Sequence, residues 1–160
     1  MSEKRQEKIK ILFVCLGNIC RSPMAEFVMK DLVQTEGLAD QFQIDSAGTL
    51  RQEVGKPVYA PAREKLLEHG IDPAGKAARL LCREDYETYD LLIGMEHSNL
   101  QEMHRICGGD PKGKFHSLLS FAGRQGGIAD PYFTGDFQQT YEDVIEGCQG
   151  LLSALRDQEV

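Results

Sequence analysis

The sequence predicts a single α/β domain in which a parallel β-sheet carries helices on both faces. Segments with strand-like and helix-like patterns alternate along the chain, as they do when parallel strands are joined by helices. The length of 160 residues suits one domain with a sizeable hydrophobic core. We expect a charged, flexible tail over residues 1–7 and one folded domain over residues 8–158.

Four segments are predicted to be strands. Residues 9–15 form a mostly apolar run, which is typical of a strand buried on both faces. Residues 42–46 alternate between apolar and polar side chains and suit an edge strand. The remaining two strands are expected over residues 89–95 and 114–119.

Four segments have the apolar spacing of helices. Over residues 25–33, apolar side chains recur at i, i+3, i+4, i+7 and i+8, and residues 57–68 give a second helix. Ser98 and Gln101 have the spacing of a capping box that opens a third helix. The most regular helical period lies over residues 137–155.

The composition excludes several classes of protein. A net charge of −7 would repel nucleic acid, so we expect no nucleic-acid partner. No apolar run reaches the roughly 18 residues of a membrane span, and residues 1–8 are polar, so we expect no leader. Five cysteines without a repeated spacing suit a reducing compartment. We therefore expect a cytoplasmic protein that acts as a monomer.

The most informative motif joins the first strand to the first helix. Cys15 and Arg21 are separated by five residues, whose backbone N–H groups can converge on one phosphate-sized anion. The helix N-terminus adds positive potential, which also stabilises a cysteine sulfur as thiolate. Gly17 and Asn18 are expected to supply the left-handed conformations that a tight loop needs.

The residues after this loop predict where the helix begins. Ser22 is expected at the N-cap and Pro23 at the first helical position. The alternative interpretation is an ordinary strand–turn–helix junction with structural cysteines at positions 15 and 20. So many positions agree with an anion-binding loop that we prefer the catalytic interpretation.

Two segments carry a resemblance to a known family. Residues 14–23 resemble the signature loop of the low-molecular-weight protein tyrosine phosphatases, and residues 130–133, Asp-Pro-Tyr-Phe, resemble that family's acid loop. Shorter runs at residues 44–48, 68–71 and 93–96 also agree. The resemblance extends over about residues 8–155.

The resemblance implies a three-layer fold with a four-stranded sheet in the order 2-1-3-4, and it implies hydrolysis of phosphotyrosine in proteins or of small aryl phosphates. Cys15 would attack phosphorus, Arg21 would hold the phosphoryl oxygens, and Asp130 would give a proton to the leaving group. No cofactor, metal or membrane is implied. The residues expected to bind phosphate or shape the loop are Leu16, Gly17, Asn18, Ile19, Cys20, Ser22 and Ser46.

The resemblance also assigns residues around the substrate and reveals two departures. Tyr132 is expected to stack on the aromatic ring of the substrate. Gln52 stands where many members have a Trp, so one aromatic wall of the pocket is missing. Lys76 stands where a His is usual. Cys20 is expected either to form a protective disulfide with Cys15 or simply to fill the loop.

Three alternatives remain open at this stage. Arginine phosphatases of the same fold usually carry Thr where Ile19 stands, so Ile19 favours phenolic substrates. An arsenate reductase needs two further cysteines to relay a disulfide, and Cys82 lacks a close partner. A non-catalytic phosphoprotein-binding module would lack one of Cys15, Arg21 and Asp130, and all three are present.

Overall fold

A four-stranded parallel sheet forms the centre of the molecule, in the order β2-β1-β3-β4. The computed structural model describes residues 7–157, so most of the predicted tail and residue 158 lie outside the described residues. Strand order and number agree with the expectation drawn from the sequence. The strands are β1 (Ile9–Cys15), β2 (Phe42–Gly48), β3 (Leu91–Gly94) and β4 (Phe115–Ser117).

Each of the four predicted helices is present, and two short helices that were not predicted are added. The α-helices are α1 (Arg21–Thr35), α2 (Ala60–Glu68), α3 (Asp85–Thr88), α4 (His97–Cys107), α5 (Pro131–Thr134) and α6 (Phe137–Asp157). Three 3₁₀ turns, η1 (Ala39–Gln41), η2 (Arg51–Glu53) and η3 (Leu118–Ala122), complete the chain. The fourth strand is shorter than predicted, because Leu118 and Leu119 begin η3 and bury their side chains completely.

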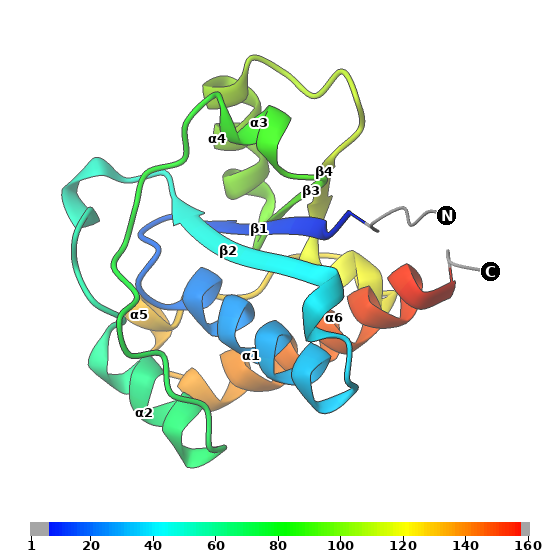
Figure 1. Cartoon of the computed structure of the whole chain (residues 1–160). Coiled ribbons are helices and arrows are strands. Elements are labelled where there is room, and N and C mark those ends of the chain that lie inside the picture. Colours follow the sequence, from blue (N-terminus) through cyan, green and yellow to red (C-terminus); the bar gives the residue numbers. More distant parts are fainter. Residues whose placement is uncertain (1–6, 158–160) are drawn as a thin grey trace.

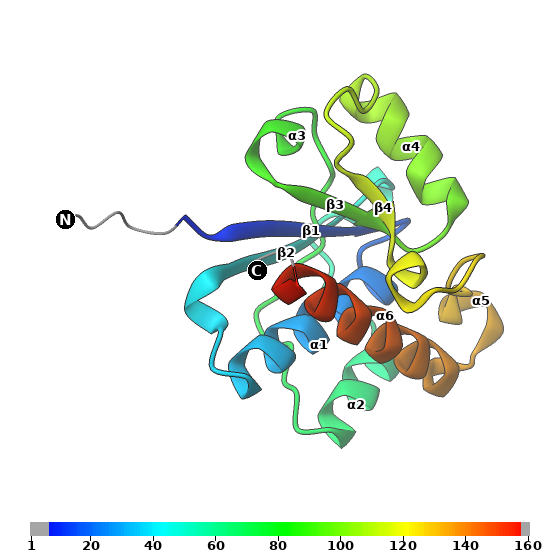
Figure 2. The same ribbon diagram turned by 90° about the vertical axis from the view of Figure 1, so that its right-hand side faces the viewer.

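Helices cover both faces of the sheet (Figure 1). On one face lie α1 and α6, with α2 and α5 at the same side; on the other face lie α3 and α4, as the second view confirms (Figure 2). The side chains of β1 alternate between two cores, with Ile11 and Phe13 in one and Leu12 and Val14 in the other. All four are fully buried, which explains why this strand is apolar throughout its second half.

The sheet brings its functional loops together at the carboxyl end of β1. Cys15, the last residue of β1, pairs with Gly48 of β2, and Val14 pairs with Gly94 of β3. Strand order reverses at β1, and parallel sheets bind ligands beyond the strand ends at such a point. A Cβ on Gly48 would come within 2.9 Å of Asn18 Cβ, so glycine is required for this loop to cross the end of β2.

Candidate active site

The loop from Cys15 to Arg21 leaves several backbone donors unpaired. Within residues 7–157, the N–H groups of Gly17, Ile19 and Cys20 have no hydrogen-bond partner, although buried N–H groups are nearly always paired. These three residues and Cys15 line one cavity. A loop with open N–H groups around a cavity can hold an anion by donating to its oxygens.

The left-handed turn of this loop falls on Asn18 rather than on Gly17. Asn18 has φ +59°, the one positive φ of a non-glycine residue in the described chain, and Gly17 has none. The prediction that Gly17 supplies a positive φ is therefore wrong. The Asn18 side chain makes the conformation tolerable, since its Oδ1 accepts a hydrogen bond from the Arg79 N–H at 3.0 Å.

Three donors surround the Cys15 sulfur. Sγ lies 3.3 Å from the Asn18 N–H, 3.4 Å from the Ser22 N–H and 3.0 Å from Ser22 Oγ. The prediction that Ser22 caps α1 is also wrong, because α1 begins at Arg21, its N-cap is Cys20 and no side chain caps it. The Ser22 hydroxyl is directed to the sulfur instead, and donors on every contact suit a thiolate.

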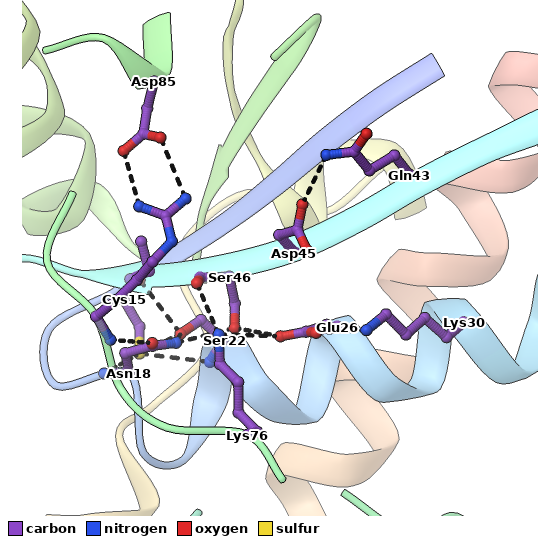
Figure 3. Close-up of polar contacts among 12 residues, drawn as sticks. Cys15, Asn18, Ser22, Glu26, Lys30, Gln43, Asp45, Ser46, Lys76 and Asp85 are labelled. Atoms are coloured by element: carbon purple, nitrogen blue, oxygen red, sulfur yellow. Dashed lines mark hydrogen bonds and ion pairs between the residues drawn. The ribbon is translucent and has the colours of Figure 1, made fainter. Parts of the chain in front are cut away.

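A buried hydrogen-bond chain sets the direction of these contacts (Figure 3). Because a carboxylate can only accept, the Ser46 hydroxyl donates to Glu26 Oε1 at 2.5 Å. Ser46 Oγ then accepts from Asn18 Nδ2 at 2.9 Å, and Asn18 Nδ2 also donates to Ser22 Oγ at 2.8 Å. Ser22 Oγ is thus already an acceptor, and its own proton is free to point to Cys15 rather than to the more distant Ala47 carbonyl, 3.4 Å away.

Lys76, one of the departures from the family pattern, joins this chain. Its Nζ donates to the Ser46 carbonyl at 2.9 Å and lies 3.4 Å from Glu26 Oε1. The other oxygen of Glu26 accepts from Lys30 at 2.6 Å. Glu26 is 3% exposed, so the two ammonium groups compensate for the cost of burying its charge.

Arg21 is almost fully buried and is held by acids. Nη1 donates to Glu96 Oε2 at 2.7 Å and to the Ile128 carbonyl at 2.8 Å, and Nη2 lies 3.2 Å from Asp130 Oδ2. Among the described residues Nε has no partner, and the Arg21 side chain lines the cavity. The acids and the carbonyl therefore hold the guanidinium through Nη1 and Nη2, while the Nε–H group is available to donate to an anion.

Sequence reasoning missed the role of Glu96. The predicted capping box of Ser98 and Gln101 is wrong: two residues separate the end of β3 from the start of α4, and the box consists of Glu96 and Asn99. Asn99 Oδ1 accepts from the N–H groups of both Met95 and Glu96, which fixes the sharp turn from strand to helix. A carboxylate directly after a buried strand was the available signal, since strand ends meet at the functional edge.

Asp130 lies at the start of α5 and faces Arg21. It is the N-cap of α5, with Oδ1 accepting from the Tyr132 N–H at 3.1 Å, and its other oxygen faces Arg21. It also lines the same cavity as Cys15. The turn thus places a carboxyl group in the same cavity as the thiol.

Apolar and charged side chains both line the cavity. Its lining residues are Cys15, Leu16, Gly17, Ile19, Cys20, Arg21, Leu50, Glu53, Asp130, Tyr132 and Phe133. Gln52 does not line it. In a 3₁₀ turn, residues three apart share a face, so η2 directs Leu50 and Glu53 to the cavity and turns Gln52 away. Phe133, which the sequence analysis did not single out, lines it beside Tyr132.

Cys20 lies in the cavity lining as an un-ionised thiol. Burial, reinforced by the neighbouring Cys15 and Asp130, raises the pKa of the Cys20 thiol well above its usual range. The two sulfurs of this loop therefore differ, with Cys15 surrounded by donors and Cys20 kept protonated. Neither forms a disulfide.

Within residues 7–157, no group of three or more His, Cys, Asp and Glu side chains is arranged to hold a metal ion. In the same residues, no helix is both long and apolar enough to cross a membrane.

The fold and this site define a class: a parallel α/β protein whose first strand ends in a cysteine held within an anion-binding loop, with an arginine and an acid at its side. The family model described as low molecular weight phosphotyrosine protein phosphatase matches residues 10–160. The chain belongs to this family of hydrolases.

Individual relatives agree. The chain is 33% identical over 153 residues to the low molecular weight protein-tyrosine-phosphatase YfkJ of Bacillus subtilis, covering 94% of this chain and 98% of that protein. The crystal structure of YfkJ superposes with a TM-score of 0.94 and covers 98% and 100% of the two chains. A Drosophila arginine phosphatase is 34% identical, with a TM-score of 0.85 and coverage of 92% and 98%.

Proposed function

We propose that this protein removes phosphate from phosphotyrosine through a phosphoryl–cysteine intermediate on Cys15. The observation that carries the proposal is the arrangement around Sγ: three donors contact the sulfur, and the unpaired N–H groups of the loop and Arg21 face the same cavity. This combination provides a nucleophile and a site for the phosphoryl oxygens in one loop.

In the first step, the Cys15 thiolate attacks phosphorus in line with the phenolic oxygen. The sulfur–phosphorus bond forms as the phosphorus–oxygen bond breaks, and Asp130 gives its proton to the departing oxygen. Arg21 and the loop N–H groups balance the charge on the three equatorial oxygens. The Ser22 hydroxyl stabilises the thiolate before attack and when it leaves again.

In the second step, water attacks the phosphoryl group and the sulfur–phosphorus bond breaks. Asp130, now a carboxylate, takes a proton from the water, and inorganic phosphate is released. Because the N-cap of α5 holds the carboxyl group beside Arg21, one residue can act in both steps.

The lining of the cavity favours an aromatic leaving group over a guanidinium. Leu16, Ile19 and Tyr132 offer apolar and aromatic surface to a phenol ring. The carboxylate of Glu53 could bind the guanidinium group of a phosphoarginine substrate, but its Oε1 is already paired with Lys56 Nζ at 2.9 Å. An arsenate reductase relay has no support, since Cys82 is exposed and does not line the cavity.

The proposal is tested by rates on p-nitrophenyl phosphate and on matched phosphotyrosine, phosphoserine and phosphoarginine peptides, with and without EDTA. We expect the phosphotyrosine peptide to be hydrolysed fastest and EDTA to have no effect. A faster rate on phosphoarginine would transfer the proposal to the arginine phosphatases, and a requirement for metal would contradict the site.

We also propose that Cys20 protects Cys15 from irreversible oxidation. Peroxide would convert the Cys15 thiolate to a sulfenic acid, and the Cys20 thiol would then form a disulfide with release of water. Peroxide should inactivate the wild type reversibly and Cys20→Ser irreversibly, as recovery after dithiothreitol treatment would measure. If no Cys15–Cys20 disulfide is found by mass spectrometry, Cys20 only fills the loop.

A cytoplasmic, monomeric protein without a nucleic-acid partner remains our expectation. The free cysteines of the described residues suit a reducing compartment, and the negative net charge opposes binding to nucleic acid.

A further inference from the structure

A second, larger cavity adjoins the catalytic one. It has a volume of about 560 Å³, against about 80 Å³ for the catalytic cavity. Ile19, Glu53 and Tyr132 line both cavities and form the boundary between them. A chain segment attached to a group in the first cavity can therefore enter the second directly.

The second cavity is walled by exposed aromatic side chains. Tyr59 and Tyr132 have their ring centroids 5.2 Å apart, yet 38% and 54% of their surface remain exposed. Figure 1 shows why they meet: α5, which carries Tyr132, lies beside the start of α2, which Tyr59 precedes. Four of the six large apolar side chains exposed in the described chain line one of the two cavities, and such concentration is typical of a binding surface.

Backbone hydrogen bonds hold the segment that lines this cavity. The Lys56 carbonyl accepts from the Ala78 N–H at 2.8 Å, the Gly55 N–H donates to the Ala78 carbonyl at 2.8 Å, and the Tyr59 N–H donates to the Ile19 carbonyl at 2.9 Å. The last of these contacts ties the cavity to the phosphate-binding loop itself. The segment that lines the cavity is therefore held in place without a bound substrate.

The charged side chains that line this cavity include one more cation than anion. Glu53 and Lys56 neutralise each other at 2.9 Å, whereas Arg63 is exposed and makes no ion pair within the described residues. A protein with a net charge of −7 thus presents a positive group beside the entrance to its active site.

We propose that this second cavity is a subsite for the peptide that carries the phosphotyrosine, and that it selects an acidic residue within one or two positions of that tyrosine. Neighbouring residues of an extended peptide lie about 3.3–3.6 Å apart along the chain, so these positions reach from the first cavity into the second. The side chain packs against Tyr59 and Tyr132, and its carboxylate meets Arg63. The proposal rests on the proposed function and makes proteins, rather than small aryl phosphates, the substrate.

The test compares peptides that differ only in charge beside the phosphotyrosine. One carries Asp and its twin carries Lys, at each of the two positions on either side, and every kcat/KM is divided by that of p-nitrophenyl phosphate. Arg63→Glu should lower this ratio about three- to tenfold for the best Asp peptide and raise it for the Lys twin. The substitution removes an attraction to the Asp side chain and adds a repulsion, both at an exposed site. The effect should shrink at high salt.

Arg51→Glu is the matched control, because Arg51 is exposed in η2, lines neither cavity and changes the net charge equally. Its ratios should stay within about twofold of wild type, as screened surface charges do. Equal ratios for the Asp and Lys peptides, or equal responses of the two variants, would overturn the subsite. Failure of the wild type to hydrolyse any aryl phosphate would instead overturn the proposed function.

Discussion

The inner side of the phosphate-binding loop contacts buried polar side chains, whereas its outer side lies among exposed apolar ones. On the inner side, Asn18, Ser22, Ser46 and Glu26 are almost fully buried, and each is paired. On the outer side, Leu16, Tyr132 and Phe133 expose between 37% and 75% of their surface. We expect the inner side to fix the sulfur and the loop regardless of substrate, and the outer side to contact the group that is being dephosphorylated.

From this difference we infer that the inner residues set the rate and the outer residues set the choice of substrate. Changes on the inner side should alter the rates on all phosphate esters by one factor. Changes on the outer side should alter the ratio between esters. The following predictions test that division.

The largest effect is expected for Cys15→Ser. Turnover should be abolished because a serine hydroxyl is not a thiolate, while inorganic phosphate should still bind, since backbone N–H groups form most of the cradle. Activity assays together with calorimetric titration of phosphate measure both. Cys82→Ser, at an exposed cysteine outside the cavity, is the control and should remain active. Full activity of Cys15→Ser would exclude the covalent route.

Asp130→Ala should reveal the proton donor through its dependence on the leaving group. Loss of a general acid typically costs about 10²–10⁴-fold, and we expect this loss for phenyl phosphate but a much smaller one for p-nitrophenyl phosphate. Asp130→Asn separates the two roles, because the amide oxygen can still cap α5 but cannot transfer the proton. If Asp130→Asn restores phenyl phosphate hydrolysis, Asp130 acts only as a cap.

Lys76→Met should weaken the inner side without changing substrate preference. Removing one cation from the buried Glu26 should lower the free energy of unfolding by about 1.5–3 kcal/mol, since hydrogen bonds to charged groups have this magnitude. The kcat/KM values for p-nitrophenyl phosphate and for peptides should fall by the same factor. Thermal unfolding and kinetics measure the two effects.

Lys30→Met is the matched control for Lys76. Lys30 pairs with the same carboxylate but is 43% exposed and does not contact Ser46, so its loss should cost less in both assays. An equal loss in the two variants, or a changed preference among substrates in Lys76→Met, would contradict the division between inner and outer sides.

The smallest effects are expected on the loop after β2. Leu50→Trp should raise kcat/KM for aryl phosphates about two- to tenfold, the range of an added aromatic contact, and leave inhibition by inorganic phosphate unchanged. Gln52→Trp should do neither, because Gln52 does not line the cavity. A larger effect at Gln52 than at Leu50 would show that η2 turns its other face to the substrate.

The sequence was informative where local patterns decide the structure. The apolar run of β1 and the periodicity of α6 depend on burial alone, and both elements were predicted within two residues of their observed ends. The spacing of Cys15 and Arg21 likewise located the loop correctly. Five residues between a strand and a helix are enough only for a tight turn at the end of the strand.

The remaining features depend on contacts and turns that apolar periodicity does not reveal. Serine is a residue type that favours the N-cap position, but the Ser22 hydroxyl forms hydrogen bonds with Asn18 and Cys15 instead. Glu96 appears in the sequence as one more surface acid, and only the placement of β3 beside β1 brings it to Arg21. The resemblance assigned Gln52 to the pocket by its position alone, without the 3₁₀ turn η2 that directs Leu50 and Glu53 to the cavity instead.

The most direct test of the account is to trap the intermediate. Asp130→Asn is mixed with p-nitrophenyl phosphate, whose leaving group departs without a proton, so the first step proceeds while the second is slowed. After rapid quenching, mass spectrometry of the peptides should find one phosphoryl group, attached to Cys15, and none in Cys15→Ser. Release of nitrophenol with no phosphoryl group on Cys15, or with one on another residue, would contradict the central claim that this sulfur is the nucleophile.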